Sequence, residues 1–251
     1  MQDSLGNRIK ENYENRTRYF LPRRTNTIIR IDGKSFHNFT RKCDRPFDSD
    51  LVSLMDHTAK CLCKNIQGAK FAYVQSDEIS ILLTDYDDIK TDAWFDSNIQ
   101  KISSISASMA TAAFNEKVSR MENIDKFKKN NNISLALFDS RVFTVPEIQE
   151  VFNYFIWRQM DATRNSIQMV AQSLYPHKEL QGKNTSVLQE MIFLKRINWN
   201  DYPVRYKRGG LIIKEFYEKE GAQRSRWVSK DPPIFTQEPE YLRTLVQCVK
   251  N

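Results

Sequence analysis

The chain has 251 residues, of which 40% are hydrophobic, and it carries a formal net charge of +7. This length and apolar content suffice for a sizeable core, which excludes an intrinsically disordered chain. No apolar stretch reaches the roughly 18 residues that cross a bilayer, and the charged N-terminus is unlike a secretory signal. We therefore expect a cytoplasmic protein with no membrane partner.

The positive charge is gathered in clusters along the chain. Lys and Arg gather at 16–24, 126–129, 205–208 and 224–230. Because clustered basic side chains attract polyanions, nucleic acids and nucleotides are the expected partners. A well-solvated surface is the alternative explanation of the charge.

The four cysteines form no CxxC pair. Cys61 and Cys63 fall inside an apolar helical pattern, and Cys43 and Cys248 lie far from them in the sequence. Tetrahedral zinc sites normally use paired ligands, and disulfides are rare in the cytosol. The pattern favours buried, reduced thiols over a zinc site.

The chain begins its regular structure with a strand and a helix. The run at 25–32 is rich in β-branched residues and ends in Asp32, which predicts a buried strand leading into a loop. Apolar residues between 51 and 66 recur at three- and four-residue spacing, which predicts a helix packed on the sheet. Either Asp48 or Ser49 can cap that helix.

A hairpin follows, with polar residues at its tip. The runs 70–75 and 79–85 are β-prone and apolar, and the acceptor-rich residues 76–78 separate them. Neighbouring strands of one sheet would bring Asp77 of this tip close to Asp32. Two close carboxylates repel each other unless a cation lies between them or one is protonated.

The second half of the chain predicts fewer strands and more helices. We expect a helix at 97–120, a polar break at 126–132, a strand or hairpin before 146, a helix from Pro146 to about Leu174, a helix at 186–196, and a strand at 211–217 before a proline-bearing tail. The order predicts an α+β fold. We expect a core at 1–140, with 141–251 packed on it as an extension of the same compact unit.

The two acids are suited to magnesium. Mg²⁺ prefers a few carboxylates together with water and phosphate oxygens, and Gly33 lets its own carbonyl approach as a third ligand. A cap or turn residue is the alternative interpretation of Asp32 alone. Two metal ions held by shared carboxylates are typical of phosphoryl or nucleotidyl transfer.

A short polar loop follows the first acid. The amides of residues 33–37 could face a triphosphate, with Lys34 as a charge partner and Phe36 or His37 packing on a base. The loop lacks the Walker spacing, and His37 could equally be a surface residue.

Five segments together resemble the tRNA(His) guanylyltransferase family, in particular its Thg-like branch of reverse-direction polymerases. They are RIDGKSFHNF at 30–39, RPFD at 45–48, YVQSDEIS at 73–80, FDSRVF at 138–143 and WRQMDATRNS at 157–166. The resemblance implies a palm-like, ferredoxin-like antiparallel sheet with packed helices and a C-terminal helical and β extension. It also implies nucleotide addition to the 5′ end of tRNA in the 3′-to-5′ direction.

The resemblance also assigns roles to individual positions. The implied catalytic residues are Asp32, Asp77 and Glu78, and the implied metal ligands are Asp32, Gly33 and Asp77. The implied nucleotide contacts are Asp32, Gly33, Lys34, Ser35, Phe36, His37, Arg45, Asp48, Ser76 and Lys101. Asp161 and Asn165 share one face of the long helix and either serve the site or brace it. Lys101 is either a triphosphate contact or a solvated lysine, and Tyr154 and Trp157 are expected in the core.

One segment differs from the eukaryotic members of the family. The segment after WRQ contains HINNLYN in those enzymes, whereas Thr163 and Met169 replace its His and its last Asn here. This resembles the bacterial and archaeal branch, which implies templated repair of 5′-truncated tRNA. The implied reaction uses two Mg²⁺ ions and ATP or GTP to activate the 5′ end, followed by attack of an incoming nucleotide. The family also implies a homotetramer.

Two other functions compete with this interpretation. A nucleotide cyclase could use the same paired aspartates, although the glycines of a GGDEF-type turn are missing before residues 76–78. The chain could also be a catalytically silent RNA-binding module that keeps the fold. Such a module would be expected to have lost one metal-binding aspartate, whereas both Asp32 and Asp77 are present.

Overall fold

The computed structural model describes residues 4–129, 132–133 and 135–247, and its main feature is a six-stranded antiparallel sheet. The strands lie side by side in the order β6-β1-β3-β2-β7-β8. Their bounds are β1 Thr27–Gly33, β2 Ala69–Gln75, β3 Glu78–Leu83, β6 Phe138–Thr144, β7 Gly210–Lys219 and β8 Ala222–Lys230. Two short strands, β4 (Lys128–Lys129) and β5 (Asn132–Ile133), pair separately.

Four of the strands and two helices form a βαββαβ unit. Helix α3 (Ser49–Asn65) connects β1 to β2, and α4 (Ile99–Ser119) lies between β3 and β6 in the chain. This order is the ferredoxin-like arrangement. The predicted α+β class is therefore confirmed, and β7 and β8 extend the same sheet beyond β2.

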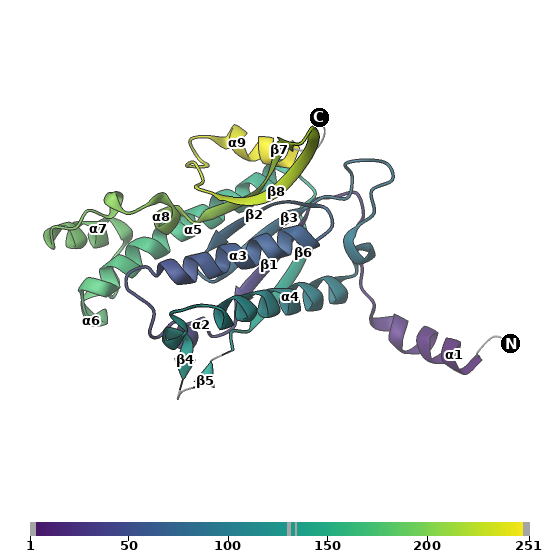
Figure 1. Cartoon of the computed structure of the whole chain (residues 1–251), viewed down its shortest axis with the longest axis horizontal. Helices are drawn as coiled ribbons and strands as arrows, with labels where there is room; N and C mark the ends of the chain where they lie inside the picture. Colours follow the sequence, from purple (N-terminus) through teal and green to yellow (C-terminus); the bar gives the residue numbers. More distant parts are fainter. Residues whose placement is uncertain (1–3, 130–131, 134, 248–251) are drawn as a thin grey trace.

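Helices cover both faces of the sheet (Figure 1). Helices α3 and α4 cover one face, and α5 (Ile148–Leu174) and α9 (Pro239–Gln247) cover the other. Ile29 and Ile31 of β1 face the first layer, whereas Ile28 faces the second. Because both faces of β1 are covered here, Ile28 and Ile29 are apolar in succession, and the partly buried Arg30 interrupts the apolar run before Ile31.

The remaining helices are short. They are α1 (Ser4–Asn12), α2 (Phe36–Phe39), α6 (His177–Leu180), α7 (Thr185–Leu194) and α8 (Val204–Arg208), with 3₁₀ turns η1 (Glu14–Thr17), η2 (Trp94–Ser97), η3 (Ile124–Phe127) and η4 (Trp199–Asp201). Helix α1 projects from the body (Figure 1). Apolar side chains of α7 and η4 pack on the C-terminal half of α5. In the described parts of the chain, every helix is too short or too polar to cross a membrane.

The first strand, the hairpin and the helices predicted at 51–66, 97–120 and 186–196 are confirmed, but the start of the long helix is not. That helix begins at Ile148, two residues after Pro146. The side-chain amide of Asn26 donates hydrogen bonds to the carbonyls of Val145 and Pro146 at 3.1 and 3.3 Å. These bonds hold the chain extended beside β1, so Pro146 precedes the helix.

Strand β8 was not predicted from the sequence. Its residues are mostly exposed and polar, so no apolar alternation marks it. It is held by backbone pairing with β7, in register from Leu211 opposite Lys230 to Lys219 opposite Ala222. Glu220 and Gly221 form the connecting turn, both with positive φ. The domain boundary expected after residue 140 falls inside β6.

Several predicted side-chain environments need correction. Cys63 is buried, but Cys43 and Cys61 are partly exposed, and Cys248 lies outside the described residues. Tyr154 is in the core as expected, whereas Trp157 is 50% exposed. Trp157 points outward because the neighbouring positions on α5, Tyr154 and Arg158, occupy the face toward the sheet.

Candidate active site

The sheet brings Asp32 and Asp77 together. Asp32 lies near the end of β1, and Asp77 lies in the two-residue turn between β2 and β3. Because β1 pairs with β3, Asp32 lies opposite Glu78, and the amide of Gly33 donates a hydrogen bond to the Asp77 carbonyl at 3.2 Å. Two acids that are 45 residues apart in sequence therefore lie at one end of the sheet.

Gly33 makes this close approach possible. A Cβ atom at position 33 would lie 2.8 Å from Oδ2 of Asp77 and 2.4 Å from the ring of Phe36. Phe36 is buried and cannot move aside. Only glycine therefore lets the Asp77 carboxylate lie against the main chain at the end of β1.

The two acids also influence each other's charge. The pKa of Asp77 is raised from 3.8 to about 6, first because the carboxyl is buried and second because the negative charge of Asp32 lies nearby. A hydrogen bond from the Ser76 side chain offsets part of this increase. Such a pair is fully ionised only at a cost in free energy, which a bound cation relieves.

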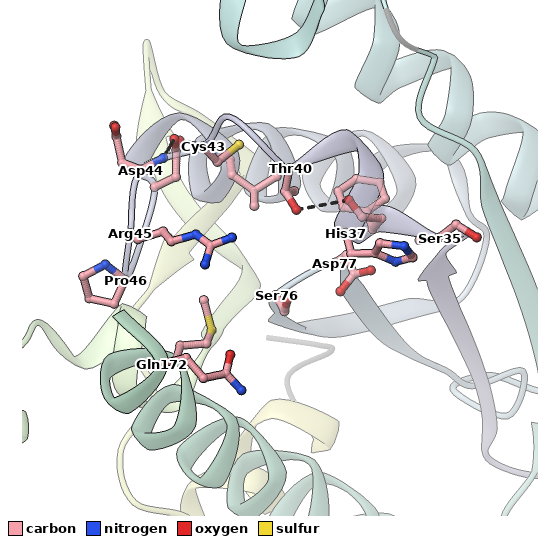
Figure 2. Close-up of a pocket in the computed structure, with 15 residues that line it drawn as sticks. Ser35, His37, Thr40, Cys43, Asp44, Arg45, Pro46, Ser76, Asp77 and Gln172 are labelled. Atoms are coloured by element: carbon pink, nitrogen blue, oxygen red, sulfur yellow. Dashed lines mark hydrogen bonds between the residues drawn. The ribbon is translucent and has the colours of Figure 1, made fainter. Parts of the chain in front are cut away.

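A cavity of about 580 Å³ opens beside Asp77 (Figure 2). Its size is in the range of small-molecule sites. Figure 2 shows Asp77 and His37 on one side, Arg45 extending toward the centre, and Gln172 of α5 below. Among the predicted nucleotide contacts, the cavity is lined by Gly33, Ser35, Phe36, His37, Arg45, Asp48 and Ser76.

Phe36 lies in the core, contrary to its predicted role as a base-packing ring. Its side chain is 5% exposed, and its ring centroid lies within 5.5 Å of those of Phe39, Phe114 and Phe138. The Phe36 ring therefore packs among other core rings beneath the cavity that it lines. His37 is exposed and remains the candidate for packing on a base.

The two predicted lysine contacts do not line the cavity. Lys34 is exposed beside it, and Asp32 likewise lies just outside the lining. Lys101 lies in the first turn of α4, 6.0 Å from the ring centroid of Phe95. Phe114, which contacts Phe36, lies about 20 Å farther along the same helix at 1.5 Å per residue. Within one chain, Lys101 is therefore remote from the cavity.

Asp48 is engaged in holding the loop and helix α3. One oxygen accepts a hydrogen bond from the amide of Leu51 at 2.9 Å, as the helix cap that the sequence predicted. The other accepts from the amide of Asp44 at 2.8 Å and from Lys126 at 2.9 Å. Because both oxygens are occupied, its predicted nucleotide contact is corrected to a structural role.

Glu78 also differs from its predicted catalytic role. Arg158 of α5 donates from Nε and Nη2 to the two carboxylate oxygens of Glu78, each at 2.8 Å. Arg30 lies 3.4 Å from the same carboxylate. Glu78 is buried, and both oxygens face this pair of arginines. It therefore pairs with Arg158 and is not free to act as a metal ligand or a base.

The predicted supporting residues brace that arginine. Oδ2 of Asp161 accepts hydrogen bonds from Arg158 at 3.0 Å and from Asn165 at 3.3 Å, and Arg164 donates to Oδ1. This geometry favours the bracing alternative for Asp161 and Asn165. Sequence reasoning missed Arg158, although an arginine at helical spacing from the buried residues of α5 indicates a buried acidic partner.

The carboxylates suit a cation that takes only part of its coordination from protein. Within the described ranges, no three His, Cys, Asp or Glu side chains are grouped to bind a metal ion. A cation held here would take two side-chain ligands, from Asp32 and Asp77, and water and phosphate oxygens would complete its shell, as Mg²⁺ prefers.

Comparison with known proteins finds one family along most of the chain. The family model for tRNAHis guanylyltransferase matches residues 6–146. A probable tRNA(His) guanylyltransferase of Dictyostelium discoideum is 31% identical over 201 residues, which cover 75% of each chain.

Two solved structures of a bacterial tRNA(His) guanylyltransferase (Thg1)-like protein resemble the whole chain. The complex with ATP is 50% identical with a TM-score of 0.86, and the complex with GTP is 47% identical with a TM-score of 0.82. Both alignments cover 97% of this chain and 99% of the other. The palm-like fold expected from the sequence is thus confirmed.

Proposed function

Because the chain belongs to the tRNAHis guanylyltransferase family and is therefore a nucleotidyltransferase, we propose that it extends the 5′ end of tRNA in the 3′-to-5′ direction. The observation that carries the proposal is the meeting of Asp32 and Asp77 beside a nucleotide-sized cavity. Clustered basic side chains on a chain of net charge +7 favour an RNA partner.

Magnesium fits the donor set of this site. Asp32, Asp77 and the main-chain carbonyl of Gly33 would hold the ions. Burial and the charge of Asp32 raise the pKa of Asp77, and a bound cation would lower that pKa again. Bound Mg²⁺ would lower the pKa of an attacking hydroxyl and stabilise the departing pyrophosphate.

The side chains of the cavity would bind and orient the nucleotide. ATP and GTP are the proposed activating substrates, in keeping with the two complexes of the similar bacterial protein. Arg45 would pair with triphosphate oxygens, and Ser35 and Ser76 would donate hydrogen bonds to them. His37 would pack on the base.

The proposed reaction has two transfer steps. The 5′-monophosphate of the RNA attacks the α-phosphate of ATP, which forms a 5′-5′ pyrophosphate bond and releases inorganic pyrophosphate. The 3′-hydroxyl of an incoming nucleoside triphosphate then attacks the activated 5′-phosphate, which forms a phosphodiester and releases AMP. A 5′-triphosphate end would enter directly at the second step.

Templated repair is the form of the reaction that we propose. Met169 lines the cavity at the position where the eukaryotic sequence pattern has its last Asn. Met169 offers no strong hydrogen-bond donor there. This replacement resembles the bacterial and archaeal branch, in which base pairing with the opposite strand of the acceptor stem would select the incoming nucleotide. We also expect a homotetramer on the family resemblance, which light scattering measures directly.

A labelled tRNA that lacks its first nucleotide tests the proposal. The tRNA is incubated with ATP and all four nucleoside triphosphates, with and without Mg²⁺. A product that grows at the 5′ end, and stops when the acceptor stem is fully paired, supports templated repair. Binding without extension would support a silent RNA-binding module, and a cyclic nucleotide product would support a cyclase.

A further inference from the structure

Arg158 makes the most complete buried ion pair near the candidate active site. Its guanidinium meets the carboxylate of Glu78 through two parallel hydrogen bonds of 2.8 Å, and the two side chains are only 6% and 9% exposed. The same Nη2 atom that bonds Glu78 also donates a hydrogen bond to Asp161 at 3.0 Å. Such a fork fixes the carboxylate in orientation as well as in position.

The carboxylate that Arg158 holds follows Asp77 directly in the chain. Glu78 begins β3, and the turn before it contains only Ser76 and Asp77. Ser76 has a φ of 47°, in the left-handed region that non-glycine residues rarely adopt. A strained turn persists only when the surrounding structure fixes it, and Arg158 fixes Glu78, the residue that follows Asp77.

Stability alone is a poor explanation for this ion pair. A buried ion pair costs desolvation free energy, and apolar residues of similar volume often replace it without loss of stability. The orientation of the pair also matters, because its hydrogen bonds turn Glu78 toward α5 and away from the cavity. One helix thus anchors the turn, and the same helix supplies Met169 and Gln172 to the cavity wall.

We infer that Arg158 is a positioning residue that acts through Glu78 to set the Asp77 carboxylate for cation binding. The inference rests on the proposed function for the identity of the cation. A change at Arg158 would thus alter the affinity of the Asp77 turn for a cation, although Arg158 contacts Glu78 and not Asp77. Loss of such orienting contacts typically weakens metal binding by about 10- to 100-fold.

Binding of Mn²⁺ to the full chain tests the inference without turnover. Free Mn²⁺ is followed by electron paramagnetic resonance in the presence of α,β-methylene ATP. Arg158→Lys keeps the charge but loses the fork. The double variant Arg158→Met/Glu78→Gln removes both charges of the fork together, so neither is left buried without its partner, and it serves as the second variant if the first does not fold. Both are expected to raise the Kd for Mn²⁺ at least tenfold.

Arg23→Lys is the matched control. Arg23 pairs with Asp85 at 2.9 Å just beyond the far end of β3, so its replacement weakens an ion pair away from the turn, although Arg23 is more exposed than Arg158. It should lower the unfolding temperature without changing the Kd for Mn²⁺. Folded Arg158 variants whose Kd stays within twofold of the parent would overturn the inference. Failure of the parent to extend tRNA would instead overturn the proposed function and leave this comparison intact.

Discussion

Replacement of Asp77 by Asn should stabilise the protein when no divalent metal is present. Asn keeps the size of the side chain and removes the charge that burial and Asp32 disfavour. A carboxyl whose pKa is higher in the folded than in the unfolded chain destabilises the fold when it is ionised. The native Asp77 therefore lowers the stability of the metal-free protein at neutral pH.

The size of this cost follows from the pKa. Asp77 has a pKa of about 6 in the folded chain against an ordinary value of 3.8, and each tenfold change in an equilibrium is worth about 1.4 kcal/mol. The full cost is therefore about 3 kcal/mol above pH 6, and it disappears as the pH falls below 3.8. For a chain of this length, this corresponds to an increase in Tm of about 6 to 12 °C.

Calorimetry at several pH values checks the prediction. At pH 8 with EDTA, Asp77→Asn should melt above the parent, and the difference should shrink at pH 4.5, where Asp77 binds its proton in the folded state. Added Mg²⁺ should raise the Tm of the parent alone. Asp92→Asn, on a side chain that is 86% exposed, is the control and should change little. A variant less stable than the parent at pH 8 would refute the electrostatic reasoning.

Three further predictions follow from single contacts. Gly33→Ala should abolish nucleotide transfer and lower the unfolding free energy by about 2 kcal/mol, because the added Cβ overlaps Asp77 and Phe36; transfer at the parent's rate would contradict the packing. Asp48→Ala should cost about 2 kcal/mol in urea unfolding through the lost cap, and an unchanged midpoint would exclude that role. Arg45→Ala should raise the KM for ATP about tenfold and leave the Kd for tRNA nearly unchanged, whereas an effect on tRNA alone would move Arg45 out of the nucleotide site.

The sequence predicted the elements that carry local patterns. The β-branched run before Asp32 and the hairpin around residues 76–78 were recognisable because buried strands and tight turns have distinctive compositions. Strand β8 was not, since its residues are polar and exposed, and backbone pairing with β7 holds it. Only the folded sheet defines that pairing.

In the candidate site, too, some features follow from the sequence and others only from tertiary packing. Asp32 and Asp77 were identified together because sheet pairing makes two distant acids neighbours. The partners of Glu78 and Asp48 depend on side-chain packing between separate elements, which spacing along the chain does not encode. An acid in a functional motif can therefore serve either the chemistry or the scaffold, and its hydrogen-bond partners distinguish the two roles.

Anomalous diffraction from crystals grown with Mn²⁺ and α,β-methylene ATP tests the central claim most directly. We predict a manganese peak within about 2.5 Å of a carboxylate oxygen of both Asp32 and Asp77, beside the main-chain carbonyl of Gly33. A peak bound by Glu78, or manganese that contacts only one of the two aspartates, would contradict the claim that these two acids form the cation site.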